Sequence, residues 1–266
     1  MFWNKKRYLC RIIFQKKEFM RKVSLILLIF LLIPSGNIST RAMRPAPVLS
    51  GTVSELAAGE QLFEEMQLGG VVNFVAFRQA VAGYLRIKEK SKPVLTLIDF
   101  TKASTEKRLF VFDMEKKKLV FSSVVAHGRN SGENYATSFS NKYGSYKSSL
   151  GFYLTGHTYQ GKNGYSLILN GLEKGINDKA RERAIVVHGA AYANPSVAAS
   201  TGRLGRSFGC PALPQAITKP IINTIKGGSV MFIYANNQDY MAQSSILKGL
   251  QQTGLLTRNQ FPHPQQ

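Results

Sequence analysis

The chain has 266 residues, of which 44% are apolar, and it carries a formal charge of +20. An apolar fraction of this size excludes an intrinsically disordered chain. The charge does not indicate a nucleic-acid-binding protein, because eight basic residues lie within positions 1–22 and the others are scattered. We therefore expect no nucleic acid as partner, and an anionic polymer of the cell envelope is the better candidate.

The first 42 residues have the pattern of an export segment. Eleven residues, 23–33, all apolar except Ser24, follow the basic positions. They are too few to span a bilayer comfortably and are typical of a secretory signal. Residues 1–42 are thus predicted to be a signal peptide, with an uncleaved N-terminal anchor as the alternative and Met20 as a second possible start. Both alternatives predict an exported protein of the periplasm or cell envelope, which touches a membrane only through this segment.

Two helices are expected after a linker at residues 43–51. Thr52 and Glu55 form a capping-box pattern at the start of the first helix. Asn73 is a suitable cap for the second helix. The apolar face of that helix is predicted to contain Phe74, Phe77, Val81, Tyr84 and Leu85. We assign residues 52–92 to a helical N-terminal extension.

After Pro93 the sequence changes to short segments rich in β-branched and aromatic residues, as is typical of strands. The predicted strands are 94–100, 108–114, 118–127, 151–156, 164–170, 184–189 and 229–235, and the second and third are expected to form a hairpin. A short helix beginning at Thr218 is predicted to direct Ile221, Ile222 and Ile225 to the core. The pattern favours a mostly-β sandwich or barrel over residues 93–257, followed by a tail at 258–266.

Cys210 lies in the segment GRSFGCPALP, residues 205–214, and is the single cysteine left if the signal is removed. An exported free thiol in a turn bounded by glycine and proline suggests a nucleophile, although a small buried apolar residue is the alternative. A thiol nucleophile needs a base, and His188 at the end of the strand IVVHG is the best candidate. We expect His188 to lower the pKa of Cys210 and to make its alkylation fast at neutral pH.

The turn around Cys210 provides further candidates. The N–H groups of Gly209 and Cys210 are predicted to bind an oxyanion. Ser207, Arg206 and Arg203 are assigned to substrate binding, with Ser207 also able to hydrogen-bond within the turn and the two arginines able to bind a carboxylate.

Two other histidines, His127 and His157, either line the same pocket or simply close turns. A zinc site made of Cys210 and the three histidines is disfavoured, because the ligands lack short paired spacings. We therefore predict no metal and no other cofactor.

These motifs resemble those of a known family. HG at 188–189 and SFGC at 207–210 are similar to the active-site signature of the YkuD-type L,D-transpeptidases, cysteine enzymes that remodel peptidoglycan. The resemblance covers about residues 70–236 and is carried by the segments 98–113, 125–141, 144–156, 165–178 and 202–214. It implies a mostly-β catalytic domain that acts on peptidoglycan stem peptides through a thioester.

By resemblance, Cys210 matches the nucleophile, His188 the base, and the Gly189 carbonyl the group that orients the imidazole. Gly209 and Cys210 match the oxyanion site, and Ser207 matches the hydroxyl of the signature. Two departures put substrate choice in doubt: Phe208 stands where most members have histidine, and the interval of 22 residues between His188 and Cys210 is longer than usual. An L,D-carboxypeptidase or related amide hydrolase, and a catalytically inactive wall-binding module, remain as alternatives.

Overall fold

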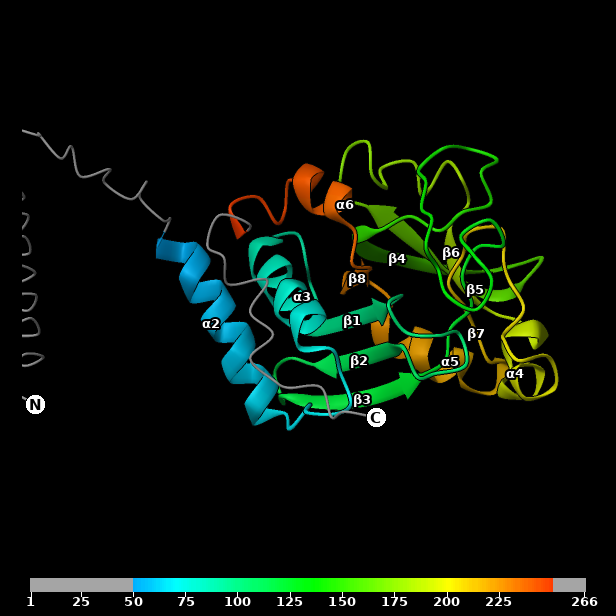
Figure 1. Ribbon diagram of the computed structural model, residues 1–266, viewed down its shortest axis with the longest axis horizontal. Coiled ribbons are helices and arrows are strands. Elements are labelled where there is room, and N and C mark those ends of the chain that lie inside the picture. The colour runs from blue at the N-terminus through cyan, green and yellow to red at the C-terminus, as the bar shows by residue number, and fades with distance from the viewer. Residues whose placement is uncertain (1–49, 251–266) are drawn as a thin grey trace, which may run out of the picture. The chain divides into compact units, whose positions relative to one another are not determined.

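The computed structural model describes residues 50–250, and all structural statements below concern this part of the chain (Figure 1). The predicted signal or anchor, most of the linker and the tail lie outside it. The helices are α2 (Ser50–Glu65), α3 (Phe74–Arg86), α4 (Pro195–Thr201), α5 (Gln215–Ile225) and α6 (Gln238–Gln243), with a 3-10 turn, η1, at Ala191–Ala193. The strands are β1 (Val94–Asp99), β2 (Leu109–Asp113), β3 (Lys118–Ser123), β4 (Gly151–Gly161), β5 (Gly164–Gly171), β6 (Val186–Gly189), β7 (Ala212–Leu213) and β8 (Val230–Tyr234).

All eight described strands belong to one sheet with the order β3-β2-β1-β8-β4-β5-β6-β7. The predicted hairpin is confirmed, because β2 and β3 pair antiparallel. The two edges of the sheet approach each other, since Ala126, beyond the end of β3, forms an antiparallel bridge with Ala212 in β7. The sheet is therefore almost closed like a barrel, and the predicted mostly-β class is confirmed.

The two helices expected before the sheet are present. The Asn73 side chain accepts hydrogen bonds from the N–H groups of Val75 and Ala76, as predicted for the cap of α3. A methyl group at Gly83 of α3 would lie 2.1 Å from the ring of Phe152 in β4, so the helix contacts the sheet closely. Leu85 was predicted to be in the apolar face, but it is 38% exposed and lies at the edge of that face.

Helix α5 differs from its prediction at one end. It begins at Gln215, and Pro220 lies inside it rather than at its start. Ile221, Ile222 and Ile225 are fully buried, as predicted, because they recur on one face of the helix. The helix passes so close to β6 that a methyl group at Gly189 would lie 2.8 Å from the hydroxyl oxygen of Thr218. The glycine after His188 thus allows the helix to pack against the end of β6.

Three short elements were not predicted, namely α4, β7 and α6. Helix α4 begins with Pro195 and is capped after Thr201 by Gly202, which has a φ of 76°. Both residues are recognised helix-boundary signals that the sequence contains.

None of the helices described within residues 50–250 has the length and apolar character of a membrane span.

Candidate active site

Cys210, in the turn before β7, and His188, in β6, lie near each other's strands at one edge of the sheet. β6 and β7 pair in parallel, with His188 opposite Ala212. Cys210 comes two residues before Ala212, and the N–H of Val186 in β6 donates a hydrogen bond of 3.5 Å to its sulfur. The sulfur also donates weakly to the carbonyl of Ala184 at 3.6 Å. Strand β6 thus holds the sulfur directly and carries the candidate base two residues further on.

The His188 ring is buried and its orientation is set by its own strand. Nδ1 lies 3.0 Å from the carbonyl oxygen of Gly189 and donates to it. This bond leaves Nε2 as the unprotonated nitrogen of a neutral ring. No hydrogen bond to Nε2 from any residue in 50–250 is present, and none joins it to the Cys210 sulfur.

The electrostatics of the pair favour its neutral form. Burial raises the pKa of the Cys210 thiol above its usual value, and the Val186 N–H and the Arg183 charge offset this only in part. Burial also lowers the pKa of His188, against a smaller opposite effect of the bond to Gly189. Both shifts oppose a thiolate–imidazolium ion pair and run against the expectation that His188 lowers the pKa of Cys210, which stays a prediction.

The SFGC turn is closed by Ser207. Its hydroxyl donates to the carbonyl of Cys210 at 2.6 Å and accepts from the N–H of Gly209 at 3.1 Å. These two bonds use the hydroxyl proton and the Gly209 N–H inside the turn. Ser207 is therefore better described as a turn-closing residue than as a substrate-binding one, and Gly209 is not a free oxyanion donor.

The backbone of this turn requires glycine at position 209. Gly209 has a φ of 126°, and a methyl group there would lie 2.9 Å from the carbonyl oxygen of Lys147. No acceptor for the Cys210 N–H is present among the other residues of 50–250. This N–H is the donor that remains available beside the sulfur.

The two arginines predicted to bind a substrate carboxylate are occupied by an internal one. Arg203 and Arg206 form ion pairs with Glu133 at 3.0 and 2.6 Å. Arg206 also donates to the carbonyl oxygens of Arg129 and Gly132. Both side chains thus fix the loop at 129–133 through Glu133, and their binding of a substrate carboxylate stays a prediction.

His127 closes a turn and does not line the site. Nδ1 accepts a hydrogen bond of 2.8 Å from Nη2 of Arg108, and Nε2 donates to the carbonyl of Gly132 at 3.2 Å. Burial and the neighbouring Arg108 charge lower the pKa of His127 to about 4. Both ring nitrogens are thus hydrogen-bonded within the protein, which favours the turn-closing alternative for His127 over substrate binding.

His157 lies elsewhere, on the exposed part of β4 next to an irregularity in the pairing with β5. No contact between His157 and the Cys210 turn is present in the described region.

Several residues of the site carried no signal in the sequence. Arg183 lies near Cys210 and is held by the carbonyl oxygens of Lys147 and Ser140 at 2.6 and 2.8 Å. Gly128 is packed against the turn, since a methyl group there would lie 3.0 Å from the Cα of Gly209. These contacts join loops that are far apart in sequence, and local patterns do not report them.

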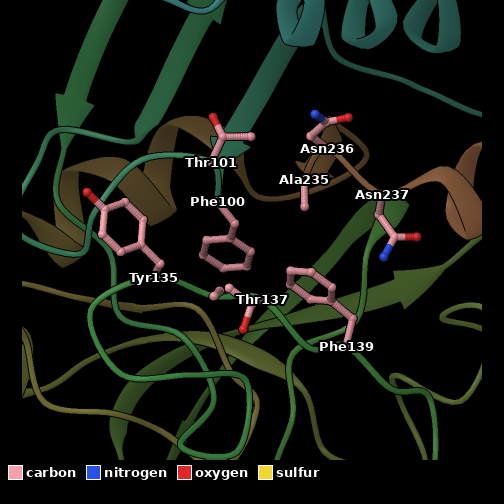
Figure 2. Close-up of a pocket in the computed structure, with 9 residues that line it drawn as sticks. Phe100, Thr101, Tyr135, Thr137, Phe139, Ala235, Asn236 and Asn237 are labelled. Atoms are coloured by element: carbon pink, nitrogen blue, oxygen red, sulfur yellow. The ribbon is translucent and has the colours of Figure 1, made fainter.

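A separate cavity of about 330 Å³ lies beside the loop that follows Gly128. Figure 2 shows the rings of Phe100 and Phe139 at its centre and the amides of Asn236 and Asn237 on one side. Neither Cys210 nor His188 lines it. The chemistry-bearing residues therefore lie outside this cavity.

Comparisons with known proteins place this geometry in a family. A family model for the L,D-transpeptidase catalytic domain matches residues 69–234. No curated protein is matched significantly. Similar solved structures include an L,D-transpeptidase from Mycobacterium smegmatis, with 14% identity, 54% of this chain and 59% of that chain covered, and a TM-score of 0.33.

Two further structures are similar at the same level. An L,D-transpeptidase from Stackebrandtia nassauensis has 16% identity, 69% of this chain and 78% of that chain covered, and a TM-score of 0.34. L,D-transpeptidase 3 from Mycobacterium tuberculosis has 12% identity, coverages of 54% and 61%, and a TM-score of 0.35. The chain spans 59% of the length of the Mycobacterium smegmatis protein. Because the family model matches more than half of the chain, the chain belongs to the L,D-transpeptidase catalytic domain family.

Proposed function

We propose that this protein is an exported L,D-transpeptidase that acts on peptidoglycan stem peptides through a thioester on Cys210. One observation carries the proposal. The sulfur of the half-buried Cys210 is fixed on β6 by Val186, and the same strand orients His188 through Gly189 so that its Nε2 stays unprotonated. Membership of the family supplies the reaction class.

The first half of the reaction forms the acyl-enzyme. The sulfur attacks the carbonyl carbon of the donor peptide bond while the thiol proton moves to Nε2 of His188. The Cys210 N–H stabilises the oxyanion that develops. The C–N bond then breaks, the His188 proton passes to the leaving amine, and a thioester remains with a free D-amino acid as product.

The second half regenerates the enzyme. The amine of a second stem attacks the thioester carbon and gives its proton to Nε2 of His188. The C–S bond breaks, and the sulfur recovers this proton. A starting state with a neutral thiol and a neutral imidazole suits this order of proton transfers. In each half-reaction His188 first accepts a proton as a base and then returns it as an acid.

Export is proposed from the sequence. The basic positions 1–22 followed by the apolar residues 23–33 form a signal or anchor pattern. These residues lie outside the described part of the chain, and their processing is tested by the N-terminal sequence of the protein recovered from cell envelopes.

Incubation with tetrapeptide muropeptides tests the reaction. Wild type is expected to release the terminal amino acid and yield crosslinked dimers, and intact-mass measurement is expected to show an acyl adduct on Cys210. Cys210→Ala should fold and give none of these. Trimmed tripeptides without dimers would instead identify a carboxypeptidase, and identical behaviour of the two proteins would identify an inactive wall-binding module.

A further inference from the structure

An exposed cluster of one cation and two aromatic rings adjoins the Cys210 turn. The guanidinium of Arg129 lies 4.3 Å from the ring centre of Tyr146 and 4.9 Å from that of Phe208. The two rings are 4.9 Å apart. Phe208 is 63% exposed and precedes the candidate nucleophile by two residues. The cluster is thus exposed on the surface next to the Cys210 turn.

The backbone of this cluster is fixed by hydrogen bonds between its three segments. The N–H of Arg129 donates to the carbonyl of Ser207 at 2.8 Å, and the carbonyl of Tyr146 accepts from Asn130 at 3.2 Å. Tyr146 has a φ of 54°, a conformation that an aromatic residue adopts only at a cost of about 1 kcal/mol. Three loops and a strained residue therefore hold the Arg129 side chain over Tyr146 and Phe208, next to the Cys210 turn.

Arg129 also differs from the other arginines around the site in what it binds. Arg203 and Arg206 are paired with Glu133, and Arg183 donates to backbone carbonyls. The Arg129 guanidinium has no hydrogen bond or ion pair with any residue in 50–250. The guanidinium carbon lies over both rings and the residue is exposed, so its N–H groups can form two parallel hydrogen bonds to a planar anion.

We infer that Arg129, held by Tyr146 and Phe208, is a specificity residue that binds the free terminal carboxylate of the donor stem. This inference rests on the proposed function, because that carboxylate belongs to the amino acid that leaves when the thioester forms. The terminal carboxylate lies one residue beyond the scissile bond. Arg129 lies next to the turn that carries Cys210, so the two can meet when the scissile bond is at the sulfur. On this inference, Arg129 selects stems that end one residue after the cleaved bond.

The test compares synthetic tetrapeptide stems whose terminus is a free acid or an amide. Wild type is expected to prefer the acid by about 10- to 100-fold in kcat/KM, the effect of a charge-assisted hydrogen-bond pair. Arg129→Gln should reduce this preference to below about 3-fold, and Arg129→Lys should retain part of it. Arg181→Gln, at another exposed arginine, makes the same charge change and should keep the full preference.

A donor stem has two carboxylates that Arg129 could bind: the free terminus, and the side-chain carboxylate of the diamino acid that precedes the scissile bond. A third stem separates them, because its terminus is a free acid and its side-chain carboxylate is an amide. Wild type should process this stem like the free acid. The inference is overturned if this stem is the disfavoured one, if Arg129→Gln keeps the preference of wild type, or if Arg181→Gln loses it to the same extent.

Binding measurements separate this inference from the proposed function. Cys210→Ala is titrated with the acid and the amide by calorimetry, alone and combined with Arg129→Gln. Tighter binding of the acid that disappears with Arg129→Gln supports the inference even if wild type turns over neither stem, in which case only the proposed function fails. Equal binding of acid and amide to Cys210→Ala, together with equal rates in wild type, overturns the inference.

Discussion

Two histidines of this protein lie in nearly identical local sequences, VAHG at 125–128 and VVHG at 186–189, and both are buried. In the first, Arg108 and the Gly132 carbonyl occupy both ring nitrogens of His127. In the second, only Nδ1 of His188 is bonded, to the carbonyl of the next residue. The availability of a nitrogen for chemistry is thus decided by the tertiary partners of the ring and not by the strand end that carries it.

The largest expected effect separates the two histidines by activity. His188→Gln removes the proposed base, and we expect kcat/KM to fall by about 10²- to 10⁴-fold. His127→Gln, the same change in the other motif, should stay within about 3-fold of wild type per folded molecule. The measurement is dimer formation from muropeptides, normalised to the folded fraction. Equal losses in the two variants would remove the distinction.

A smaller effect separates them by stability. The folded pKa of His127 is about 4, below the value of 6.5 for an unperturbed ring. The unfolded chain therefore binds more protons between these two values, so the free energy of unfolding falls as the pH drops from 6.5 towards 4. At about pH 4, this one residue lowers the free energy of unfolding by about 3 kcal/mol relative to neutral pH.

Urea unfolding at several pH values measures this contribution. The variant His127→Gln is expected to be less stable than wild type at pH 7, because the buried Arg108 loses its fitted acceptor. The gap between the two proteins should narrow in acid. Asp99 and Glu173 have raised pKa values, so their protonation makes the folded protein more stable as the pH falls. Both proteins contain these groups, so the difference between the two free energies of unfolding does not depend on them. A gap that is independent of pH would show that His127 titrates normally.

The smallest effect concerns the thiol beside His188. Because burial raises the pKa of Cys210, the rate of alkylation by iodoacetamide should still be rising through pH 9, by about tenfold per pH unit below the pKa. An ion pair with His188 would give a flat rate from about pH 6 to pH 9 instead. Stopped-time alkylation followed by mass spectrometry distinguishes the two profiles.

Local patterns predicted much of this molecule because they reflect local forces. The run of β-branched residues before His188 predicted a strand there, and Asn73 predicted the start of α3. The same kind of pattern cannot report that Glu133 neutralises Arg203 and Arg206, since these pairs form only after distant loops meet. The cluster around Arg129 was missed for this reason.

One missed element did have a local signal. From the sequence we describe the interval between His188 and Cys210 only as longer than usual, although within it Asn194 and Pro195 mark a helix start and Gly202 a helix end. The domain boundaries given from the sequence, an extension at 52–92 and a catalytic domain at 93–257, stay a prediction.

The bridge between Ala126 and Ala212 joins the two edges of the sheet and almost closes it into a barrel. It consists of two hydrogen bonds, of 2.8 and 3.4 Å, one residue away from His127 and two residues from the thiol. Breaking both costs roughly 1–3 kcal/mol, well below the cost of unfolding a domain. We therefore expect thermal opening of this bridge to displace the Cys210 turn before the rest of the strands separate, so that the proposed activity is lost on heating while most of the secondary structure persists.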